Sequence, residues 1–205
     1  MTDTRDEPDA GALLAMTAPG PAALEHLHRH LEAAAAHAGI LDVAYTTVDT
    51  PVGSLLLAST EKGLVRVAYS SEDHDRVLET LATRLSPRVL RAPRRLDEAA
   101  RQVEQYFARS RTTFDLALDQ SLSSGFRLLV QSHLPQIGYG HTRSYAEVAR
   151  LVGNPRAVRA VGSACATNPL PVVIPCHRVL RTDGTLGGYV GGSAAKTALL
   201  DLEVA

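Results

Sequence analysis

The residues best suited to chemistry are Cys176 and His177, which follow a proline-rich stretch. A cysteine attacks carbon as the thiolate, and a nearby imidazole can take the thiol proton. A carboxylate can hold and charge-balance that imidazole, and Glu203 near the C-terminus is the candidate for this third role. The set indicates a nucleophilic thiol. The competing interpretation is that Cys176 is only a small buried apolar side chain.

The segment that leads to the thiol, residues 168–175, is predicted to be stiff and apolar. Its three prolines fix φ and remove N–H donors. The β-branched residues 172–174 predict a short buried strand that ends at the thiol. Neighbouring side chains of an extended chain point opposite ways, so we expect His177 to need a bridging water or a bend to reach Cys176.

Other uses of these residue types fit the sequence less well. A zinc site on Cys165, Cys176 and His177 has no fourth ligand at the usual spacing. The histidines of a helix expected at 22–38 have no carboxylate or cysteine cluster to complete a metal site. A papain-like protease would place its histidine far along the chain and carries a different local signature. We therefore expect no metal.

Composition places the chain among ordinary globular proteins of one or two domains, with 205 residues, 45% hydrophobic and 21% charged. Two cysteines, no secretory leader and no apolar run near the ~18 residues of a membrane span predict a reducing, cytoplasmic setting without a membrane. Residues 1–120 hold 13 Lys/Arg against 18 Asp/Glu, whereas residues 121–205 hold 8 against 4. The basic second half suits a polyanionic partner, although chance alone explains so small an excess.

The pattern predicts an α+β fold in three parts: a disordered tail and short helix at 1–40, a small α+β domain at 41–120, and a mainly helical domain at 121–205. In the middle part, turn residues separate the runs of an antiparallel β meander. The expected elements there are strands at 43–48, 54–59 and 64–69, helices at 73–85 and 94–109, and a short strand at 114–118.

The last part reads as helices joined by loops. Ser144 and Glu147 form a capping box that opens a helix through Leu151. Asn154 and Pro155 supply an N-cap and a first-turn proline for the next helix, which makes a helix-turn-helix candidate. The other expected helices are 126–134, with Phe126, Leu129, Val130 and Leu134 facing inward, and a last helix from Ser193 that carries Glu203.

Taken together, these motifs resemble the O6-alkylguanine-DNA alkyltransferases, also called methylated-DNA–protein-cysteine methyltransferases. The resemblance is carried by Pro-Cys-His-Arg-Val at 175–179, Arg-Ser-Tyr at 143–145 and the run from Asn154 to Gly162. Further matches are Asn-Pro at 168–169, Gly-Tyr-Val-Gly-Gly at 188–192 and the closing stretch 196–203. The match spans residues 125–203, and residues 42–118 resemble the family's N-terminal domain more loosely.

The resemblance implies DNA repair by direct reversal of damage. An alkyl group would pass irreversibly from O6-alkylguanine in double-stranded DNA to Cys176, once per molecule and without a cofactor. The target nucleotide would be flipped out of the duplex, because its alkyl carbon is out of reach inside the stack. The implied protein is a monomer.

The resemblance also carries roles to individual residues. Cys176 falls on the nucleophile, His177 on the water-linked base and Glu203 on the carboxylate. Tyr145 falls on the tyrosine that hydrogen-bonds the flipped guanine and helps protonate it as it leaves, and Asn168 falls on the asparagine that braces the turn. The implied substrate pocket is formed by Tyr189, Val179, Val190 and Ser144.

The implied DNA-binding surface lies on the second helix of the helix-turn-helix. Arg159 falls on the arginine finger, which fills the gap left by the extruded base. Small residues let that helix approach the minor groove closely. The DNA-binding set is Arg159, Arg156, Ala157, Ala160 and Gly162.

Three alternatives remain at this point. The chain could be an alkyltransferase-like protein that flips damaged bases without repairing them, although such relatives replace the nucleophile. It could be a helix-turn-helix regulator, which would bind duplex DNA with no change in protein mass. It could be a thiol hydrolase, which would turn over many times on an ester or peptide.

Overall fold

The computed structural model describes residues 20–204, which fall into two compact units divided after Ile40. The first unit contains helix α2 (Pro21–His37), which begins with a proline in its first turn. The helix expected at 22–38 is confirmed, whereas the tail expected at 1–20 lies almost wholly outside the described residues. Within residues 20–204, no three His, Cys, Asp or Glu side chains gather as a possible metal site.

The second unit begins with a four-stranded sheet in the order β3-β2-β1-β4. Strands β1 (Val43–Thr50), β2 (Gly53–Thr60) and β3 (Gly63–Tyr69) form the predicted antiparallel meander. Strand β4 (Val89–Arg91) pairs with β1 in parallel and was not predicted. At the β2–β3 turn Gly63 has φ of +130° and a Cβ there would meet the Ala117 carbonyl, so only glycine fits.

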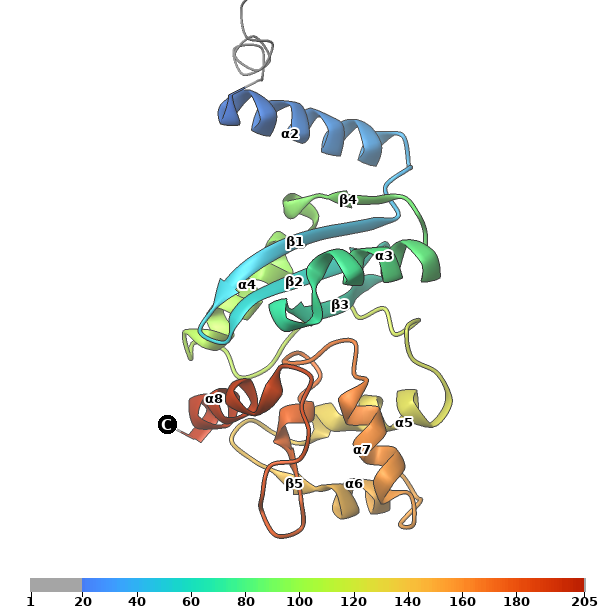
Figure 1. Cartoon of the computed structure of the whole chain (residues 1–205), viewed down its shortest axis with the longest axis vertical. Coiled ribbons are helices and arrows are strands. Elements are labelled where there is room, and N and C mark those ends of the chain that lie inside the picture. Colours follow the sequence, from blue (N-terminus) through green and yellow to red (C-terminus); the bar gives the residue numbers. More distant parts are fainter. Residues whose placement is uncertain (1–19, 205) are drawn as a thin grey trace, which may run out of the picture. The chain divides into compact units, whose positions relative to one another are not determined.

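Both faces of this sheet are covered. Three consecutive residues of β2, Leu55, Leu56 and Leu57, are fully buried although their side chains alternate between faces. Helix α3 (His74–Arg84) packs Val77 and Leu81 into the cluster on one face. The short turn η1 (Ser70–Glu72) precedes α3, and the short turn η2 (Pro93–Leu96) precedes helix α4 (Asp97–Phe107). Helix α4 lies behind the strands in the view of Figure 1.

One predicted strand of this region is wrong. Residues 114–118 form no strand and meet the sheet through a single bridge between Leu64 and Leu118. The Leu64 N–H donates to the Ala117 carbonyl and the Asp119 N–H donates back to Leu64, which is the whole backbone pairing of this segment with β3. Apolar residues do alternate in 114–118, but this segment pairs with the sheet at one bridge only.

The remainder of the second unit is mainly helical. It contains α5 (Gly125–His133), η3 (Leu134–Gln136), α6 (Tyr145–Leu151), α7 (Val158–Ala166), η4 (Cys176–Arg178) and α8 (Gly192–Val204). A two-residue parallel ladder joins β5 (Arg143–Ser144) to β6 (Val179–Leu180). The α+β class is confirmed, and no described helix is long and apolar enough to cross a membrane.

Helices α6 and α7 form the predicted hairpin, with one correction (Figure 1). The capping box is confirmed, since the Ser144 hydroxyl accepts from the Glu147 N–H and the Glu147 carboxylate accepts from the Ser144 N–H. Helix α7, however, begins at Val158 rather than at Pro155, because residues 154–157 form a separate turn in which the Ala157 N–H donates to the backbone carbonyl of Asn154.

Two further expectations need correction. Leu129 was expected to face inward on α5 but is 41% exposed, and the half-buried Leu128 takes the inner position. Residues 172–174 are buried as predicted, but they form turns rather than a strand. Val172 has φ of +72°, a left-handed conformation that strands exclude and that β-branched residues rarely adopt.

Candidate active site

The backbone around Cys176 is bent sharply. Pro175 has φ of −81° and ψ of 63°, and the Cys176 N–H donates to the Ile174 carbonyl at 2.8 Å, which together define an inverse γ-turn. The chain then enters the 3-10 turn η4 at Cys176. This bend replaces the extended geometry expected from the sequence, so Cys176 and His177 do not point to opposite faces of a strand.

Asn168 holds this bend in place. Its amide nitrogen donates to the Ile174 carbonyl at 2.9 Å and to Sγ of Cys176 at 3.2 Å, while its amide oxygen accepts from the Leu170 N–H at 3.0 Å. The residue is 1% exposed, so these three bonds satisfy its polar atoms away from water. Asn168 therefore both fixes the turn and donates to the thiol sulfur.

His177 is fully buried and its two ring nitrogens differ in surroundings. Nε2 lies 2.9 Å from Oε1 of Glu203, whereas Nδ1 has no hydrogen-bond partner among the described residues. Burial lowers the pKa of His177 despite the adjacent carboxylate, so the ring is neutral near pH 7. An ionised Glu203 only accepts, so Nε2 carries the ring proton and Nδ1 has a free lone pair.

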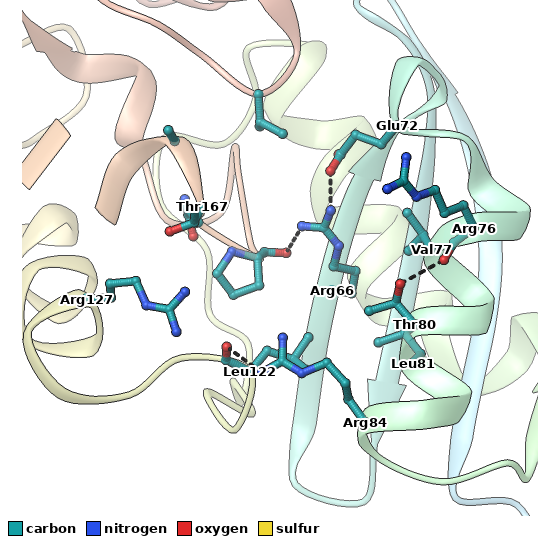
Figure 2. Close-up of a pocket in the computed structure, with 14 residues that line it drawn as sticks. Arg66, Glu72, Arg76, Val77, Thr80, Leu81, Arg84, Leu122, Arg127 and Thr167 are labelled. Carbon is teal, nitrogen blue, oxygen red and sulfur yellow. Dashed lines mark hydrogen bonds and ion pairs between the residues drawn. The ribbon is translucent and has the colours of Figure 1, made fainter. Parts of the chain in front are cut away.

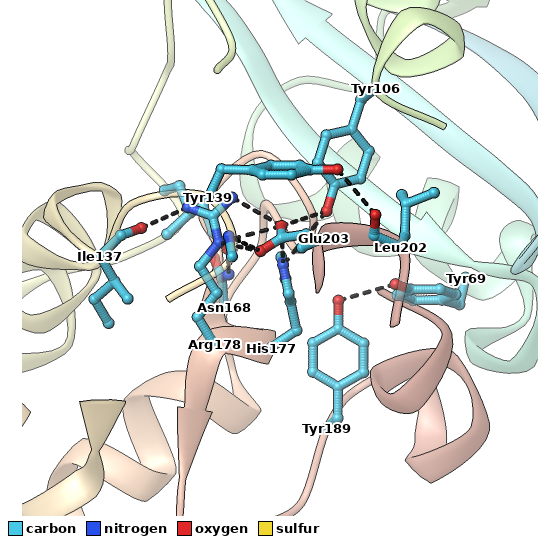
Figure 3. Close-up of polar contacts among 12 residues, drawn as sticks. Tyr69, Tyr106, Ile137, Tyr139, Asn168, His177, Arg178, Tyr189, Leu202 and Glu203 are labelled. Carbon is cyan, nitrogen blue, oxygen red and sulfur yellow. Dashed lines mark hydrogen bonds and ion pairs between the residues drawn. The ribbon is translucent and has the colours of Figure 1, made fainter. Parts of the chain in front are cut away.

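Glu203 is the centre of a buried charged cluster (Figure 3). Arg178 donates to both carboxylate oxygens, through Nε at 2.9 Å and Nη2 at 2.8 Å, and also to the Ile137 carbonyl. The hydroxyl of Tyr106 donates to Oε1 at 2.6 Å. Burial alone would raise the pKa of Glu203, but the hydrogen bonds from His177, Arg178 and Tyr106 bring it down to about 2.

Two members of this cluster were missed in the sequence. Arg178 lies inside the Pro-Cys-His-Arg-Val motif, so its place in the sequence could have indicated a role in the site. Tyr106 comes from α4, 97 positions before Glu203, and nothing in the local pattern of that helix marks it. The Tyr106 ring also packs edge-on against Tyr139, whose hydroxyl donates to the Leu202 carbonyl at 3.0 Å.

The thiol of Cys176 is buried, with the residue 1% exposed and no disulfide to Cys165. Burial raises the pKa of the Cys176 thiol to about 11, although the Asn168 amide and the Lys196 charge favour the thiolate. Lys196 is itself fully buried, and its ammonium donates to the Val179 carbonyl at 2.6 Å. At neutral pH the resting group is therefore a thiol that needs a base.

Tyr145 stands at the start of α6, directly after the cap Ser144, and is half-buried. Burial raises its pKa to about 12. Lys196 lies 5.9 Å from its ring centre. A Cβ on Gly187 would come within 2.2 Å of the Tyr145 hydroxyl, so the loop before Tyr189 passes directly over this hydroxyl.

The loop that carries Tyr189 and Val190 is held to the sheet. The hydroxyls of Tyr189 and Tyr69 lie 2.9 Å apart, and Figure 3 shows this pair beside His177, whose ring centre lies 6.3 Å from that of Tyr189. A Cβ on Gly191 would meet the Tyr69 ring at 2.6 Å. Tyr69 ends β3 and is a further contact that the sequence did not reveal.

The predicted DNA-binding residues lie apart from this cluster, on and just before α7. Arg156, Arg159 and Ala160 are exposed, whereas Ala157 and Gly162 are half-buried. Neither arginine has an ion-pair or hydrogen-bond partner among the residues described. The structure thus brings together the predicted catalytic set and keeps the DNA-binding set on a separate surface.

Two family models match the chain. Residues 43–120 match the ribonuclease-like domain of the 6-O-methylguanine DNA methyltransferases, and residues 125–205 match their DNA binding domain. The constitutive methylated-DNA–protein-cysteine methyltransferase of Bacillus subtilis is 41% identical over 160 residues, which are 78% of this chain and 94% of that protein. The enzyme of Methanosarcina barkeri is 40% identical over 78% of this chain and 96% of its own length.

Comparison with solved structures finds the same family as the sequence comparisons. The Mycobacterium tuberculosis O6-methylguanine methyltransferase superposes with a TM-score of 0.68 at 37% identity, covering 79% of this chain and 93% of that one. A second structure of that protein, in complex with DNA, gives a TM-score of 0.67 at 37% identity over 78% of this chain and 92% of that one. The chain therefore belongs to the family of 6-O-methylguanine DNA methyltransferases, the methylated-DNA–protein-cysteine methyltransferases.

Proposed function

We propose that this protein repairs DNA by moving the alkyl group of O6-alkylguanine in double-stranded DNA onto Sγ of its own Cys176. The observation that carries the assignment is that Nδ1 of His177, the residue after Cys176, has no hydrogen-bond partner among the described residues, while Nε2 is held by Glu203. The names of the relatives support the same reaction. They favour it over a regulator or a non-enzymatic binding protein.

The first step is loss of the thiol proton. With a pKa of about 11, Cys176 is almost wholly protonated at neutral pH, so its reactivity depends on a base. The neutral imidazole of His177 accepts that proton at Nδ1, directly or through one water molecule. Glu203 then stabilises the imidazolium, and Asn168 donates to the developing thiolate.

The second step is displacement at the alkyl carbon. The Sγ–C bond forms as the C–O6 bond breaks, and the electron pair of the broken bond goes to the guanine. Tyr145 is proposed to supply a proton to the guanine as it leaves, which avoids a free guanine anion, and the proton that His177 took from the thiol then returns to Tyr145 through water. The products are a thioether on Cys176 and an unmodified guanine. Because nothing in the site cleaves a thioether, each molecule acts once.

The buried thiol requires a covering segment to move. Cys176 is 1% exposed, and the loop from Gly184 to Gly192 carries Tyr189 and contains five glycines. We propose that this loop closes over the flipped base, with Val179, Val190 and Ser144 also lining the pocket. Its glycines make the required backbone rearrangement inexpensive.

DNA is proposed to bind along α7. The related M. tuberculosis protein has been solved with DNA, and this domain of the chain matches the family's DNA binding domain. Arg159 would occupy the gap left by the flipped nucleotide, Arg156 would contact phosphate, and Ala157, Ala160 and Gly162 would permit close approach. We further propose a monomer that acts in the cytoplasm, where Cys165 and Cys176 stay reduced.

The test is a repair assay on a duplex oligonucleotide that contains one O6-methylguanine. The intact protein should repair no more than one lesion per molecule, even with excess substrate. Cys176→Ala should repair none and should still bind the duplex. Repeated turnover by the intact protein, or repair by the alanine variant, would contradict the proposal.

A further inference from the structure

A second concave site lies between α3, β3 and the start of α5, and it is lined by arginines. The cavity has a volume of about 490 Å³, within the range of ordinary ligand pockets. Figure 2 shows Arg66 entering it from β3, Arg76 and Arg84 from α3, and Arg127 from α5. The one carboxylate in the lining is Glu72, so the wall carries a net charge of about three positive units.

The four guanidinium groups are not equally occupied. Arg66 is ion-paired with Glu72 and donates to the Pro169 carbonyl at 3.2 Å. Arg84 has one long bond, 3.4 Å, to the Leu122 carbonyl. The guanidinium groups of Arg76 and Arg127, in contrast, have no hydrogen-bond or ion-pair partner anywhere in residues 20–204, although the Arg76 carbonyl accepts from the Thr80 hydroxyl. The cavity therefore holds donors that are available to an anion without breaking existing bonds.

The floor of the cavity is apolar. Val77 and Leu81 of α3 and Leu122 form it, and all three belong to the core cluster on that face of the sheet. The hydroxyls of Thr80 and Thr167 complete the rim. Guanidinium forks match phosphate oxygens, and an apolar floor matches the flat face of a base.

We propose that this cavity is a nucleotide-binding site, in which the arginines of the wall hold the phosphate and the adjoining base or sugar lies against the apolar floor. The nucleotide comes either from a single-stranded stretch of DNA or from the free nucleotide pool. None of the residues proposed to bind it is needed for the alkyl transfer described above. The site is therefore an addition to that function.

The site lies next to the turn that holds the nucleophile. Asn168 and Pro169 line the cavity, and the Pro169 carbonyl accepts from both Arg66 and the Val67 N–H. Asn168 in turn donates to Sγ of Cys176. A bound nucleotide would thus sit behind the bend that positions the thiol.

The experiment is isothermal titration of the full chain with three probes: inorganic phosphate, thymidine monophosphate and a short oligothymidylate strand. The pocket variant is Arg76→Ala/Arg127→Ala, in which both side chains are exposed and lack partners, so folding should be preserved. The matched control is Arg94→Ala/Arg101→Ala, which removes the same charge from exposed arginines outside the cavity.

Thymidine monophosphate or the oligonucleotide should bind the intact chain, and the pocket variant should weaken that binding by about tenfold or more, while the control stays within about twofold. If the pocket variant loses affinity only for the oligonucleotide, the ligand is a DNA strand. If it also loses affinity for the mononucleotide, the ligand is a free nucleotide. Absence of binding by all three probes, binding of inorganic phosphate alone, or equal binding by the two variants would overturn the proposal. Binding is read without methyl transfer, so its outcome is independent of the proposed repair reaction.

Discussion

The two regions proposed for chemistry and for DNA binding are built in opposite ways. Around Glu203 the charged and polar groups are buried and paired with one another, with His177 Nδ1 left open. On and just before α7 the guanidinium groups of Arg159 and Arg156 are exposed and have no partner in the described part of the chain. The first region has a fixed internal geometry, and the second has groups ready for an external polyanion.

The proposed chemistry and the proposed DNA binding therefore take place in different dielectric surroundings. In the buried cluster, low dielectric strengthens each contact, so a single ionised carboxylate sets the tautomer of His177 and neutralises Arg178. On the exposed surface, water and salt weaken every individual charge, and affinity for DNA must come from several contacts together. Substitutions in the two regions should therefore differ in their effects on stability, on the transfer rate and on DNA binding.

The largest effect is expected from Glu203→Gln. The substitution leaves Arg178 buried without a counter-charge and replaces the charged partner of His177 by a neutral amide, which stabilises an imidazolium far less. We expect the free energy of unfolding to fall by about 3–5 kcal/mol, and single-turnover methyl transfer to slow by about 10²-fold or more. Urea unfolding and rapid-quench kinetics would measure the two effects.

The control for this variant is Glu98→Gln, which breaks the exposed ion pair with Arg101. It should change stability by no more than about 1 kcal/mol and leave the transfer rate unchanged. If the two glutamine variants were equally stable and equally active, the buried cluster would have no special role.

The pH dependence should also distinguish the regions. Burial lowers the pKa of His177 below its usual 6.5, so the rate should be flat at neutral pH and should fall, by up to about tenfold per pH unit, only below pH 6.5. A single-turnover pH profile measures this. A rate that falls already between pH 8 and 7 would contradict a neutral buried base.

Stability should respond to acid in the same direction. The unfolded His177 gains a proton below about pH 6.5 while the folded one does not, so stability falls as the pH drops through that range. Glu203 has a folded pKa of about 2 against an ordinary 4.5, so its contribution is present above pH 4.5 and is lost between about pH 4.5 and 2. Urea midpoints at several pH values would follow both losses.

On the exposed side, Arg159→Ala should slow methyl transfer by roughly tenfold, because a flipped nucleotide loses the group that fills its place. Arg156→Ala should instead weaken duplex binding and reduce the slope of log affinity against log salt by about 1. Neither should lower the unfolding midpoint. A destabilised Arg159→Ala would contradict the separation of the two regions.

The smallest effect is expected from Ser144→Ala, which removes the side-chain cap of α6. Position 144 is only half-buried, so the alanine should cause no further change in packing. The free energy of unfolding should fall by about 1 kcal/mol. Thr83→Ala is the matched control, since its hydroxyl only donates to the Glu79 carbonyl on an exposed helix face. Equal unfolding midpoints for the two variants would show that the capping box contributes nothing.

Local rules predicted the elements well where a single segment decides its own structure. The meander, the helices and the capping box follow from alternation, helical spacing and Ser144 with Glu147. These local rules gave wrong predictions where a turn or a distant contact determines the backbone conformation, as at Val172 and at the start of α7. The strand expected at 114–118 likewise lacks enough partners on the sheet.

The candidate site divides along the same line. Cys176, His177, Asn168 and Glu203 were predicted from motifs, and the fold brings these four together. Tyr106 and Tyr69 were not predicted, because each acts from the sheet region on residues far away in sequence. Only the folded chain specifies such contacts, since no spacing rule links α4 to α8 or β3 to the loop that carries Tyr189.

The most direct test uses the two thiols of this chain as nucleophile and internal control. Both Cys165 and Cys176 are buried and unbridged, but only Cys176 adjoins His177 and accepts from Asn168. After one turnover on a methylguanine-containing duplex, tandem mass spectrometry of the digested protein should find the methyl group on Cys176 and none on Cys165. A methyl group on Cys165, or repaired DNA with both thiols unmodified, would contradict the account.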